Sequence, residues 1–202
     1  MIDPENIHCL ALNYIGVGKN KQNPLYFVKS KNSLCFDGAL VKYPSDCIKM
    51  WTEVELGVVI KENCYKVSEQ EADKFIEGFI VCGDVTCGNI HNRDHHLGFS
   101  KSRKNYCPVS NEIISINLKN LGNLKLSTYV NGKLTQVGNT RDMFFNPHQS
   151  LSYISNITEL SKGDIILTGT PSGVENNTIN AGDEVIHRIE KIGEVGFHLV
   201  NE

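Results

Sequence analysis

The chain has 202 residues, of which 40% are hydrophobic and 21% are charged, and its formal net charge is -3 at pH 7. A chain of this length can bury roughly two thirds of its unfolded surface in one domain, so it needs neither disulfides nor a structural metal to fold. No apolar stretch approaches the roughly 18 residues of a membrane span, and residues 1–6 do not resemble a signal peptide. We therefore expect a cytoplasmic protein without a membrane partner. The short basic run 101–104 lacks interleaved aromatic residues, which argues against a nucleic-acid partner.

Short apolar runs bounded by Gly, Asn, Asp and Pro recur along the chain and predict strands. They lie at 7–12, 25–28, 54–60, 79–82, 113–116, 124–130, 165–167, 184–189 and 193–199. Ser68 and Glu71 have capping-box spacing before an apolar stripe, which predicts a helix that ends at Gly78. The dipeptide Asn131-Gly132 predicts a two-residue hairpin turn. A second helix is expected after residue 146, with Pro147 at its first position. These elements together predict a β-rich α+β fold.

Two glutamates, Glu53 and Glu55, lie two residues apart at the start of a strongly apolar segment. Because side chains alternate along a strand, both carboxylates project from one face while Val54 and Leu56 point to the other. Like charges side by side repel each other, and burial raises the cost, so a buried pair favours a bound cation. The alternative is a solvent-facing strand edge that carries two ordinary surface charges.

A third carboxylate, Asp84, follows the apolar segment 79–82, and we expect it where this strand passes into a loop. Three carboxylates from two strands offer hard oxygen ligands, which favour Mg²⁺, Mn²⁺ or Ca²⁺ over zinc. Such a set would leave about three octahedral positions for water or substrate. The carboxylate and keto oxygens of a 2-oxo acid can chelate a metal held in this way, and the metal would stabilise an enolate.

With these residues in place, the sequence resembles the fumarylacetoacetate hydrolase family, in particular its small single-domain members that act on acylpyruvates, oxaloacetate and related 2-oxo acids. The resemblance covers about residues 7–195 and rests on blocks that occur in the family's order. They are ALNY (11–14), PLYFVK (24–29), EVELGVVI (53–60), GDVT (83–86), KS (101–102), CPV (107–109), VNGKLTQ (130–136) and GDIILTGTPSGV (163–174). The resemblance implies a mixed β-sandwich roll, one catalytic domain over residues 1–202, and assembly as a homodimer.

The same resemblance implies roles for individual residues. Mg²⁺ or Mn²⁺ would be bound by Glu53, Glu55 and Asp84. Lys101 would lie at the substrate, where its ammonium group can stabilise enolate charge or relay a proton. Without the matching block, a solvated loop lysine would be the simpler interpretation of Lys101. Further substrate contacts are implied for Lys29, Thr170 and Gln136.

The sequence departs from the family pattern in two places. Family hydrolases carry a His and, three residues later, a Glu that together activate the attacking water, whereas here these positions are Val17 and Asn20. The family's arginine after the aspartate block is replaced by Gly88, which removes a guanidinium that could clamp a carboxylate. His91, His95 and His96 lie in the segment expected to cover the metal and could supply a replacement base, and His91 is the best candidate because it is nearest in sequence to Asp84. The alternative is that His91 is an exposed or structural loop residue.

Three hypotheses for the function follow. The first is a metal-dependent enzyme that stabilises the enolate of a small 2-oxo acid, by isomerisation, decarboxylation or hydration, since these reactions do not need the missing pair of residues. The second is hydrolysis of a carbon-carbon bond in an acylpyruvate, which requires a base for the attacking water. The third is a metal- or ligand-binding homologue that has lost catalysis, and the substitutions at Val17, Asn20 and Gly88 motivate it.

Overall fold

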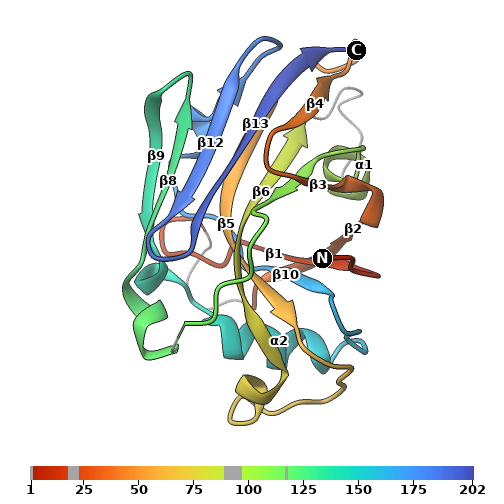
Figure 1. Ribbon diagram of the computed structural model, residues 1–202, viewed down its shortest axis with the longest axis vertical. Helices are drawn as coiled ribbons and strands as arrows, with labels where there is room; N and C mark the ends of the chain where they lie inside the picture. Colours follow the sequence, from red (N-terminus) through yellow and green to blue (C-terminus); the bar gives the residue numbers. More distant parts are fainter. Residues whose placement is uncertain (1, 18–22, 89–96, 117) are drawn as a thin grey trace.

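A computed structural model of the protein describes residues 2–17, 23–88, 97–116 and 118–202, and its strands form two sheets that contact each other (Figure 1). The first sheet contains β1 (Ile7–Ala11), β2 (Leu25–Lys29), β3 (Leu34–Phe36), β5 (Met50–Ile60), β6 (Ile76–Cys87), β7 (Cys107–Val109), β10 (Ile165–Leu167) and β11 (Thr178–Ile179). Its order is β2-β1-β10-β5-β6-β7-β3, and β11 pairs with β5. The β1–β10 and β3–β7 pairs are parallel, while β5 and β6 are antiparallel neighbours at the centre.

The second sheet contains β4 (Ala39–Tyr43), β8 (Lys125–Val130), β9 (Lys133–Asn139), β12 (Glu184–Ile189) and β13 (Gly193–Asn201). Its order is β4-β13-β12-β8-β9, with β4 and β13 parallel. The predicted hairpin turn is confirmed, because Asn131 and Gly132 connect β8 to β9 with φ angles of 50° and 74°. Two mixed sheets with few helices confirm the predicted β-rich sandwich.

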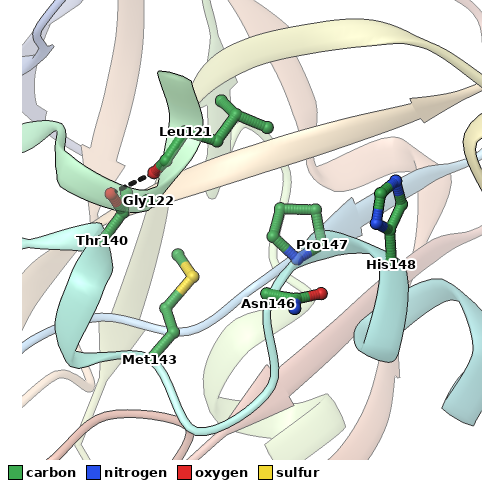
Figure 2. Close-up of a pocket in the computed structure, with 7 residues that line it drawn as sticks. All are labelled: Leu121, Gly122, Thr140, Met143, Asn146, Pro147 and His148. Atoms are coloured by element: carbon green, nitrogen blue, oxygen red, sulfur yellow. Dashed lines mark hydrogen bonds between the residues drawn. The ribbon is translucent and has the colours of Figure 1, made fainter. Parts of the chain in front are cut away.

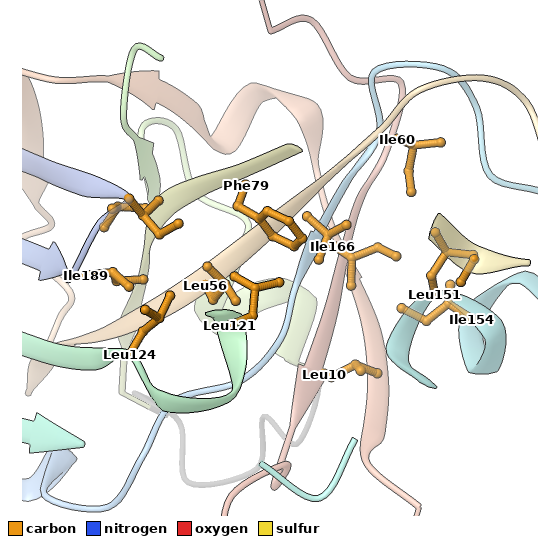
Figure 3. Packing of buried hydrophobic residues seen from close by; sticks show 14 of the residues in the cluster. Leu10, Leu56, Ile60, Phe79, Leu121, Leu124, Leu151, Ile154, Ile166 and Ile189 are labelled. Atoms are coloured by element: carbon orange, nitrogen blue, oxygen red, sulfur yellow. The ribbon is translucent and has the colours of Figure 1, made fainter. Parts of the chain in front are cut away.

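The largest hydrophobic cluster lies on one face of the two central strands (Figure 3). Leu56 of β5 and Phe79 of β6 belong to it, together with Leu126 of β8 and Ile189 of β12 from the second sheet. Val54 lies in the same cluster, so the even-numbered side chains of β5 point between the sheets. The odd-numbered side chains of β5 therefore project from the other face, as the alternation predicts.

Helices are short and peripheral to the sheets. They are α1 (Leu97–Lys101) and α2 (Pro147–Ser155), with 3₁₀ helices η1 (Lys31–Ser33), η2 (Ala72–Phe75), η3 (Leu118–Asn123), η4 (Thr140–Asp142) and η5 (Val174–Asn176). The prediction for α2 is confirmed, because Asn146 caps it, Gln149 completes a capping box, and Leu151 and Ile154 are buried. Within the described ranges, no helix has the length and apolar character that crossing a membrane requires.

The helix predicted from Ser68 to Gly78 is wrong, since only the four-residue η2 forms in this segment. The Ser68 hydroxyl bonds the Glu71 carboxylate at 2.8 Å and caps no backbone N–H. The chain enters β6 at Ile76 instead, where pairing with β5 outweighs the local helical pattern. Gly78 lies within β6 and so does not end a helix. The absence of a side chain at Gly78 allows close packing, because a Cβ there would lie 2.7 Å from the Ile113 side chain.

The strand predicted at 113–116 is also wrong. This segment makes one isolated bridge, between Ile114 and Phe79, and its remaining described residues join no sheet. Its apolar side chains pack on the core from outside, since Ile114 and Ile116 are partly buried against the largest cluster. An apolar run this short is compatible with packing alone, so its composition did not decide between strand and loop.

Candidate active site

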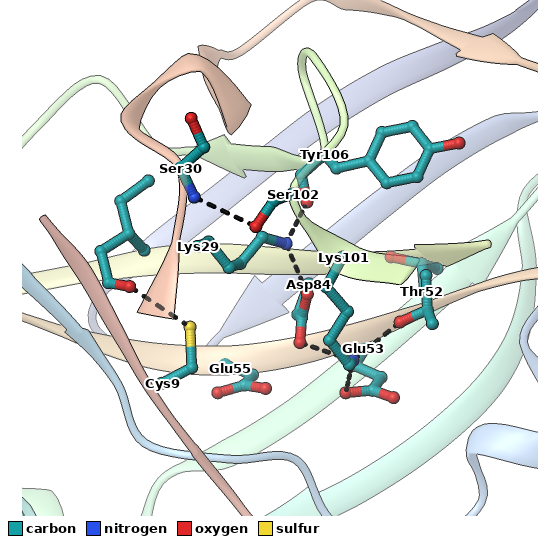
Figure 4. A network of polar contacts seen from close by, with 12 residues as sticks. Cys9, Lys29, Ser30, Thr52, Glu53, Glu55, Asp84, Lys101, Ser102 and Tyr106 are labelled. Atoms are coloured by element: carbon teal, nitrogen blue, oxygen red, sulfur yellow. Dashed lines mark hydrogen bonds and ion pairs between the residues drawn. The ribbon is translucent and has the colours of Figure 1, made fainter. Parts of the chain in front are cut away.

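Three carboxylates meet on the face of β5 and β6 that points away from the largest hydrophobic cluster (Figure 4). Glu53 and Glu55 project from the same side of β5, and Asp84 of β6 is paired directly with Glu53 in the antiparallel register. One oxygen from each residue can be chosen so that all three lie within 4.8 Å of one another. The structure thus brings together the three acidic residues that the sequence singled out.

Burial distinguishes this cluster from an ordinary acidic surface. Glu55 is 3% exposed and Asp84 is 1% exposed, so the solvent-facing alternative is wrong for this pair of strands. Asp84 does not lie where the strand passes into a loop, as we predicted, because β6 continues for three more residues to Cys87. The cross-strand position of Asp84 opposite Glu53, and not a strand end, is what delivers its carboxylate to the cluster.

The electrostatic environment distinguishes Glu55 from Asp84. Burial raises the pKa of the Glu55 carboxyl well above its usual range, and the nearby Asp84 and Glu53 carboxylates raise it further. Burial also acts to raise the pKa of Asp84, but the Lys101 and Lys29 ammonium groups outweigh it and lower that pKa. The cluster therefore holds negative charge that is only partly compensated by the protein itself.

Two buried lysines supply this compensation. Lys101 Nζ donates hydrogen bonds to Asp84 Oδ2 at 2.7 Å, to Glu53 Oε2 at 3.1 Å and to Thr86 Oγ1 at 2.7 Å. Lys29 Nζ donates to Asp84 Oδ1 at 2.5 Å and to the Tyr106 carbonyl oxygen at 2.7 Å. The Lys29 side chain has no exposed surface, and among the described residues its contact with the three carboxylates is the bond to Asp84.

Each carboxylate also has a donor that orients it. Trp51 Nε1 donates to Glu53 Oε1 at 2.9 Å, and the Gly169 N–H donates to Glu55 Oε2 at 2.5 Å. Lys29 serves Asp84 in the same way. Sequence reasoning missed Trp51, although its position two residues before Glu53 on the same strand face was a usable signal. It also missed Gly169, whose bond joins residues 114 positions apart.

The loop after β10 requires a glycine at residue 169. Gly169 has a φ of +90°, and a Cβ there would lie 2.9 Å from the Leu10 carbonyl oxygen. Asn13 fixes the loop from the other side, because its Nδ2 donates to the Thr168 carbonyl oxygen at 2.8 Å. This packing brings the Gly169 N–H to Glu55, and Thr170 follows Gly169 directly in the same loop.

Two of the residues implied as substrate contacts bond each other beside this loop. Gln136 of β9 donates from Nε2 to Thr170 Oγ1 at 3.1 Å and to the Pro171 carbonyl oxygen at 2.8 Å. Gln136 is 2% exposed and Thr170 is 8% exposed. Thr170 thus belongs to the same loop that holds Glu55, whereas Gln136 supports that loop from the second sheet.

The predicted departures are only partly visible. Val17 is half-buried next to the Gly16 turn, while Asn20 and His91 lie outside the described residues. Gly88 is buried, its N–H donates to the Lys49 carbonyl oxygen at 2.6 Å, and a Cβ at residue 88 would lie 3.0 Å from that oxygen. The backbone at residue 88, where the resemblance led us to expect an arginine, is therefore packed closely.

A separate pocket of about 150 Å³ lies at the start of α2 (Figure 2). None of the residues predicted for the site lines it. Its lining consists of Leu121, Gly122, Thr140, Met143, Asn146, Pro147 and His148. The pocket is therefore separate from the acidic cluster, and no carboxylate or lysine of the cluster lines it.

The donor set of the cluster fits a divalent cation. Three carboxylates and two ammonium groups leave an excess of one negative charge when all are ionised. The ligand atoms are oxygens, which suit hard cations such as Mg²⁺, Mn²⁺ or Ca²⁺. The raised pKa of Glu55 also favours a bound cation. Burial and the neighbouring carboxylates favour a proton on Glu55, and a cation can take the place of that proton.

Comparisons with known proteins identify the family to which the chain is similar. The family model described as fumarylacetoacetate (FAA) hydrolase C-terminal matches residues 7–200. The mitochondrial oxaloacetate tautomerase of Bos taurus is 35% identical over 191 residues, covering 88% of this chain and 86% of its own length. The 4-hydroxyphenylacetate degradation bifunctional isomerase/decarboxylase of Escherichia coli is 32% identical, covering 97% of this chain and 47% of that longer protein.

Among solved structures, the chain is similar to 2-hydroxyhepta-2,4-diene-1,7-dioate isomerase from Mycobacterium marinum, with a TM-score of 0.91 and 29% identity. This similarity covers all of the present chain and 76% of the other. The family model and the similar proteins match nearly the whole chain. The three residues of the acidic cluster lie in the sequence blocks 53–60 and 83–86, on which the resemblance was based. The chain belongs to the fumarylacetoacetate hydrolase family.

Proposed function

We propose that the protein is a divalent-metal-dependent enzyme that acts on a small 2-oxo acid through the enolate of that substrate. The observation that carries the proposal is the cluster of half-buried Glu53 with buried Glu55 and Asp84, whose ligand atoms lie within 4.8 Å of one another. A buried acidic cluster with surplus negative charge is costly unless a cation or a proton compensates it.

In this proposal the three carboxylates hold the cation, and their orienting donors keep them in place. When bound, the cation supplies Lewis-acid stabilisation of negative charge on the substrate's oxygens. Lys101 lies beside two of the three ligands, at 2.7 Å and 3.1 Å, so its ammonium group adds positive charge at the same point. Thr170 offers its hydroxyl to the substrate carboxylate from the loop that also orients Glu55.

The proposed roles of the supporting residues differ. Gln136 acts on the substrate by holding Thr170 and the Pro171 carbonyl, to which it donates at 3.1 Å and 2.8 Å. A direct substrate contact for Lys29 stays a prediction. Its enclosure by Asp84 and the Tyr106 carbonyl oxygen supports a role in holding Asp84.

We place interconversion of keto and enol isomers first among the reactions, because it moves a proton and needs no activated water. The names of the relatives support this order, since they include an oxaloacetate tautomerase, an isomerase/decarboxylase and a dienedioate isomerase. Decarboxylation of a 3-carboxylated 2-oxo acid uses the same enolate and comes second. Hydration of an unsaturated 2-oxo acid comes third.

The test is a panel of oxaloacetate, acylpyruvates and unsaturated 2-oxo acids, assayed with Mg²⁺ and with a chelator. We expect turnover of at least one of these substrates that the chelator abolishes and that Glu55→Gln lowers by on the order of 10³-fold. Glu62→Gln is the matched control, because Glu62 is exposed and lies outside the cluster. Mg²⁺ binding without any chelator-sensitive turnover would reject the enzyme in favour of the ligand-binding homologue.

Hydrolysis of acylpyruvates is the second candidate function. It requires a base for the attacking water, and Val17 cannot serve as one. Among the described residues, no histidine hydrogen-bonds to Glu53, Glu55 or Asp84, so we propose His91 as the base if hydrolysis occurs. His91→Ala should then abolish hydrolysis and leave keto-enol interconversion. Equal loss of both reactions would contradict this role.

The resemblance also supports proposals about the state of the protein. We propose Mg²⁺ as the metal, a homodimer as the assembly, a single catalytic domain over residues 1–202, and the cytoplasm as the location. Calorimetric titration with Mg²⁺, Mn²⁺ and Ca²⁺ would rank the metals, and light scattering would give the mass of the assembly in solution. A monomeric mass at assay concentration would reject the homodimer.

A further inference from the structure

A buried histidine of the second sheet packs against β5 and β6, on the face of these strands opposite the acidic cluster. His187 of β12 is 0% exposed and packs between the sheets, with its ring 5.8 Å from that of Phe197. Its ring also lies against Gly83, where a Cβ would come within 2.9 Å of His187 Cδ2. Because Gly83 immediately precedes Asp84, the histidine is packed on the backbone that carries a carboxylate of the site.

His187 is the centre of a chain of buried hydrogen bonds. Its Nε2 lies 2.7 Å from Thr52 Oγ1, next to Glu53 in β5, and its Nδ1 lies 3.0 Å from Thr128 Oγ1 of β8. Thr128 Oγ1 donates to Gln136 Oε1 at 3.1 Å, and Gln136 Nε2 donates to Thr170 Oγ1 at 3.1 Å. We call these five residues the His187 chain. It connects a metal-ligand strand to the loop that faces the substrate.

Two backbone carbonyls determine the direction of these bonds. Asn177 Nδ2 donates to the Thr52 carbonyl oxygen at 3.0 Å, so this atom is the nitrogen, and it donates also to Gln136 Oε1 at 2.7 Å. At the other end of the amide, Gln136 Nε2 donates to the Pro171 carbonyl oxygen at 2.8 Å. Turning the Gln136 amide over would place its NH2 group against the Asn177 donor and its oxygen against the Pro171 carbonyl oxygen. The Thr170 hydroxyl therefore accepts from Gln136, and its own proton is left to point elsewhere.

The same reasoning assigns the protonation of the histidine. Gln136 Oε1 can only accept, so the Thr128 proton is used in the bond to Gln136. Thr128 must then accept from His187 Nδ1–H, and His187 Nε2 must accept the Thr52 proton. Burial lowers the pKa of His187 to about 3, which agrees with a neutral ring. Every hydrogen bond in the chain then has one donor and one acceptor.

We propose that His187 is a positioning residue that acts through Thr128 and Gln136 to keep the Thr170 hydroxyl an acceptor within the protein and a donor toward the substrate carboxylate. This role rests on the proposed contact between Thr170 and the substrate. If His187 could not donate from Nδ1, the Thr128 proton would be free to turn to the histidine, and Gln136 would lose one of the bonds that orient its amide.

The first test is of the chain itself and does not depend on activity. Nitrogen-15 NMR of the histidines should show His187 as the neutral Nδ1–H tautomer, without titration between pH 5 and pH 8. The Nε2–H tautomer, or protonation within this range, would overturn the assignment.

The second test uses oxalate, a dianion that mimics the enolate of a 2-oxo acid, with the Mg²⁺-loaded protein. His187→Leu removes both ring nitrogens and should weaken oxalate binding by about tenfold, the typical size of losing one hydrogen bond to a charged group. His187→Asn keeps a donor three bonds from Cα, where Nδ1 lies, and should restore most of the affinity. His198→Leu is the matched control, because His198 lies in the same sheet and is exposed.

A double-mutant cycle with Thr170→Val decides whether the effect passes through Thr170. We expect His187→Leu to weaken oxalate binding no further once Thr170→Val is present, with Mg²⁺ affinity unchanged throughout. An equal effect in both backgrounds would overturn the proposal, as would absence of oxalate binding to the wild type. If His187→Leu does not fold, the oxalate affinity of His187→Asn and the tautomer seen by NMR still test the proposal. Oxalate binding without turnover of any 2-oxo acid would reject the proposed function and leave this role standing.

Discussion

The acidic cluster and His187 lie on opposite faces of β5 and β6, and the cluster and the His187 chain are built on different principles. In the cluster, three carboxylates crowd together and two lysines offset only part of the charge. In the chain, all groups are neutral and each described bond has a donor and an acceptor. The difference indicates that the cluster needs a cation from outside to balance its charge, whereas the chain is held by neutral hydrogen bonds within the protein and leaves only the Thr170 proton for a ligand. Four predictions test this contrast.

The largest effect is expected from Lys29→Met in the presence of a chelator. Removing one partner of a buried ion pair leaves the Asp84 charge poorly compensated, so the free energy of unfolding should fall by about 3 kcal/mol or more. Urea denaturation measures the change. Lys31→Met is the control, because that side chain is 55% exposed. Equal and small losses in the two variants would show that the cluster does not need Lys29.

The second prediction concerns the neutral chain and pH. The pKa of His187 is about 3 in the folded protein and 6.5 for the ordinary side chain, so the unfolded state binds the proton more readily as pH falls below 6.5. The contribution of the neutral His187 ring to the unfolding free energy is therefore complete above pH 6.5 and is lost as the pH falls toward 3. Between pH 7.5 and pH 4, the wild type should lose about 3 kcal/mol more unfolding free energy than His187→Asn. Parallel pH profiles of the two proteins would contradict a neutral buried ring.

Metal addition should separate the two regions next. At a Mg²⁺ concentration of about 100 times the dissociation constant, the unfolding free energy of the wild type should rise by about 2.7 kcal/mol. His187→Asn should respond like the wild type, since the chain holds no metal ligand. Glu55→Gln should respond much less. Thermal unfolding with and without Mg²⁺ measures the three responses, and a full response of Glu55→Gln would remove Glu55 from the ligand set.

The smallest effect is expected from Trp51→Phe, which keeps a large ring and removes the donor to Glu53 Oε1. Loss of a group that orients a metal ligand typically lowers metal affinity by about tenfold or somewhat more. Calorimetric titration with Mg²⁺ would show this change. Unchanged affinity would mean that β5 and Lys101 hold Glu53 in position without the Trp51 donor.

Local features of the sequence predicted the parts of the molecule that are determined locally. The side-chain alternation at Glu53 and Glu55, the turn at Asn131-Gly132 and the capped helix at Asn146 all follow from neighbouring residues. The helix expected at 68–78 failed because pairing between β6 and β5, a contact distant in sequence, overrides local propensity.

The supporting contacts of the site were beyond prediction for the same reason. The bond from Lys29 to Asp84 spans 55 positions, and that from Gly169 to Glu55 spans 114. His187 attracted no attention in the sequence, because a single histidine in a strand has no spacing that indicates its partners. Its role became visible only when Thr52 and Thr128 were placed on either side of its ring.

The register of β5 against β6 has a consequence for how this protein tolerates changes in length. Glu53 pairs directly with Asp84, so adding or deleting one residue between either of them and the turn-side ends of their strands would rotate a carboxylate into the apolar layer that contains Val54. The connecting residues 61–75 lie outside this pairing. Within this connection Val67 and Ala72 are buried in the core, whereas residues 68–71 are exposed, so insertions at 68–71 would lengthen the connection without changing which side chains meet.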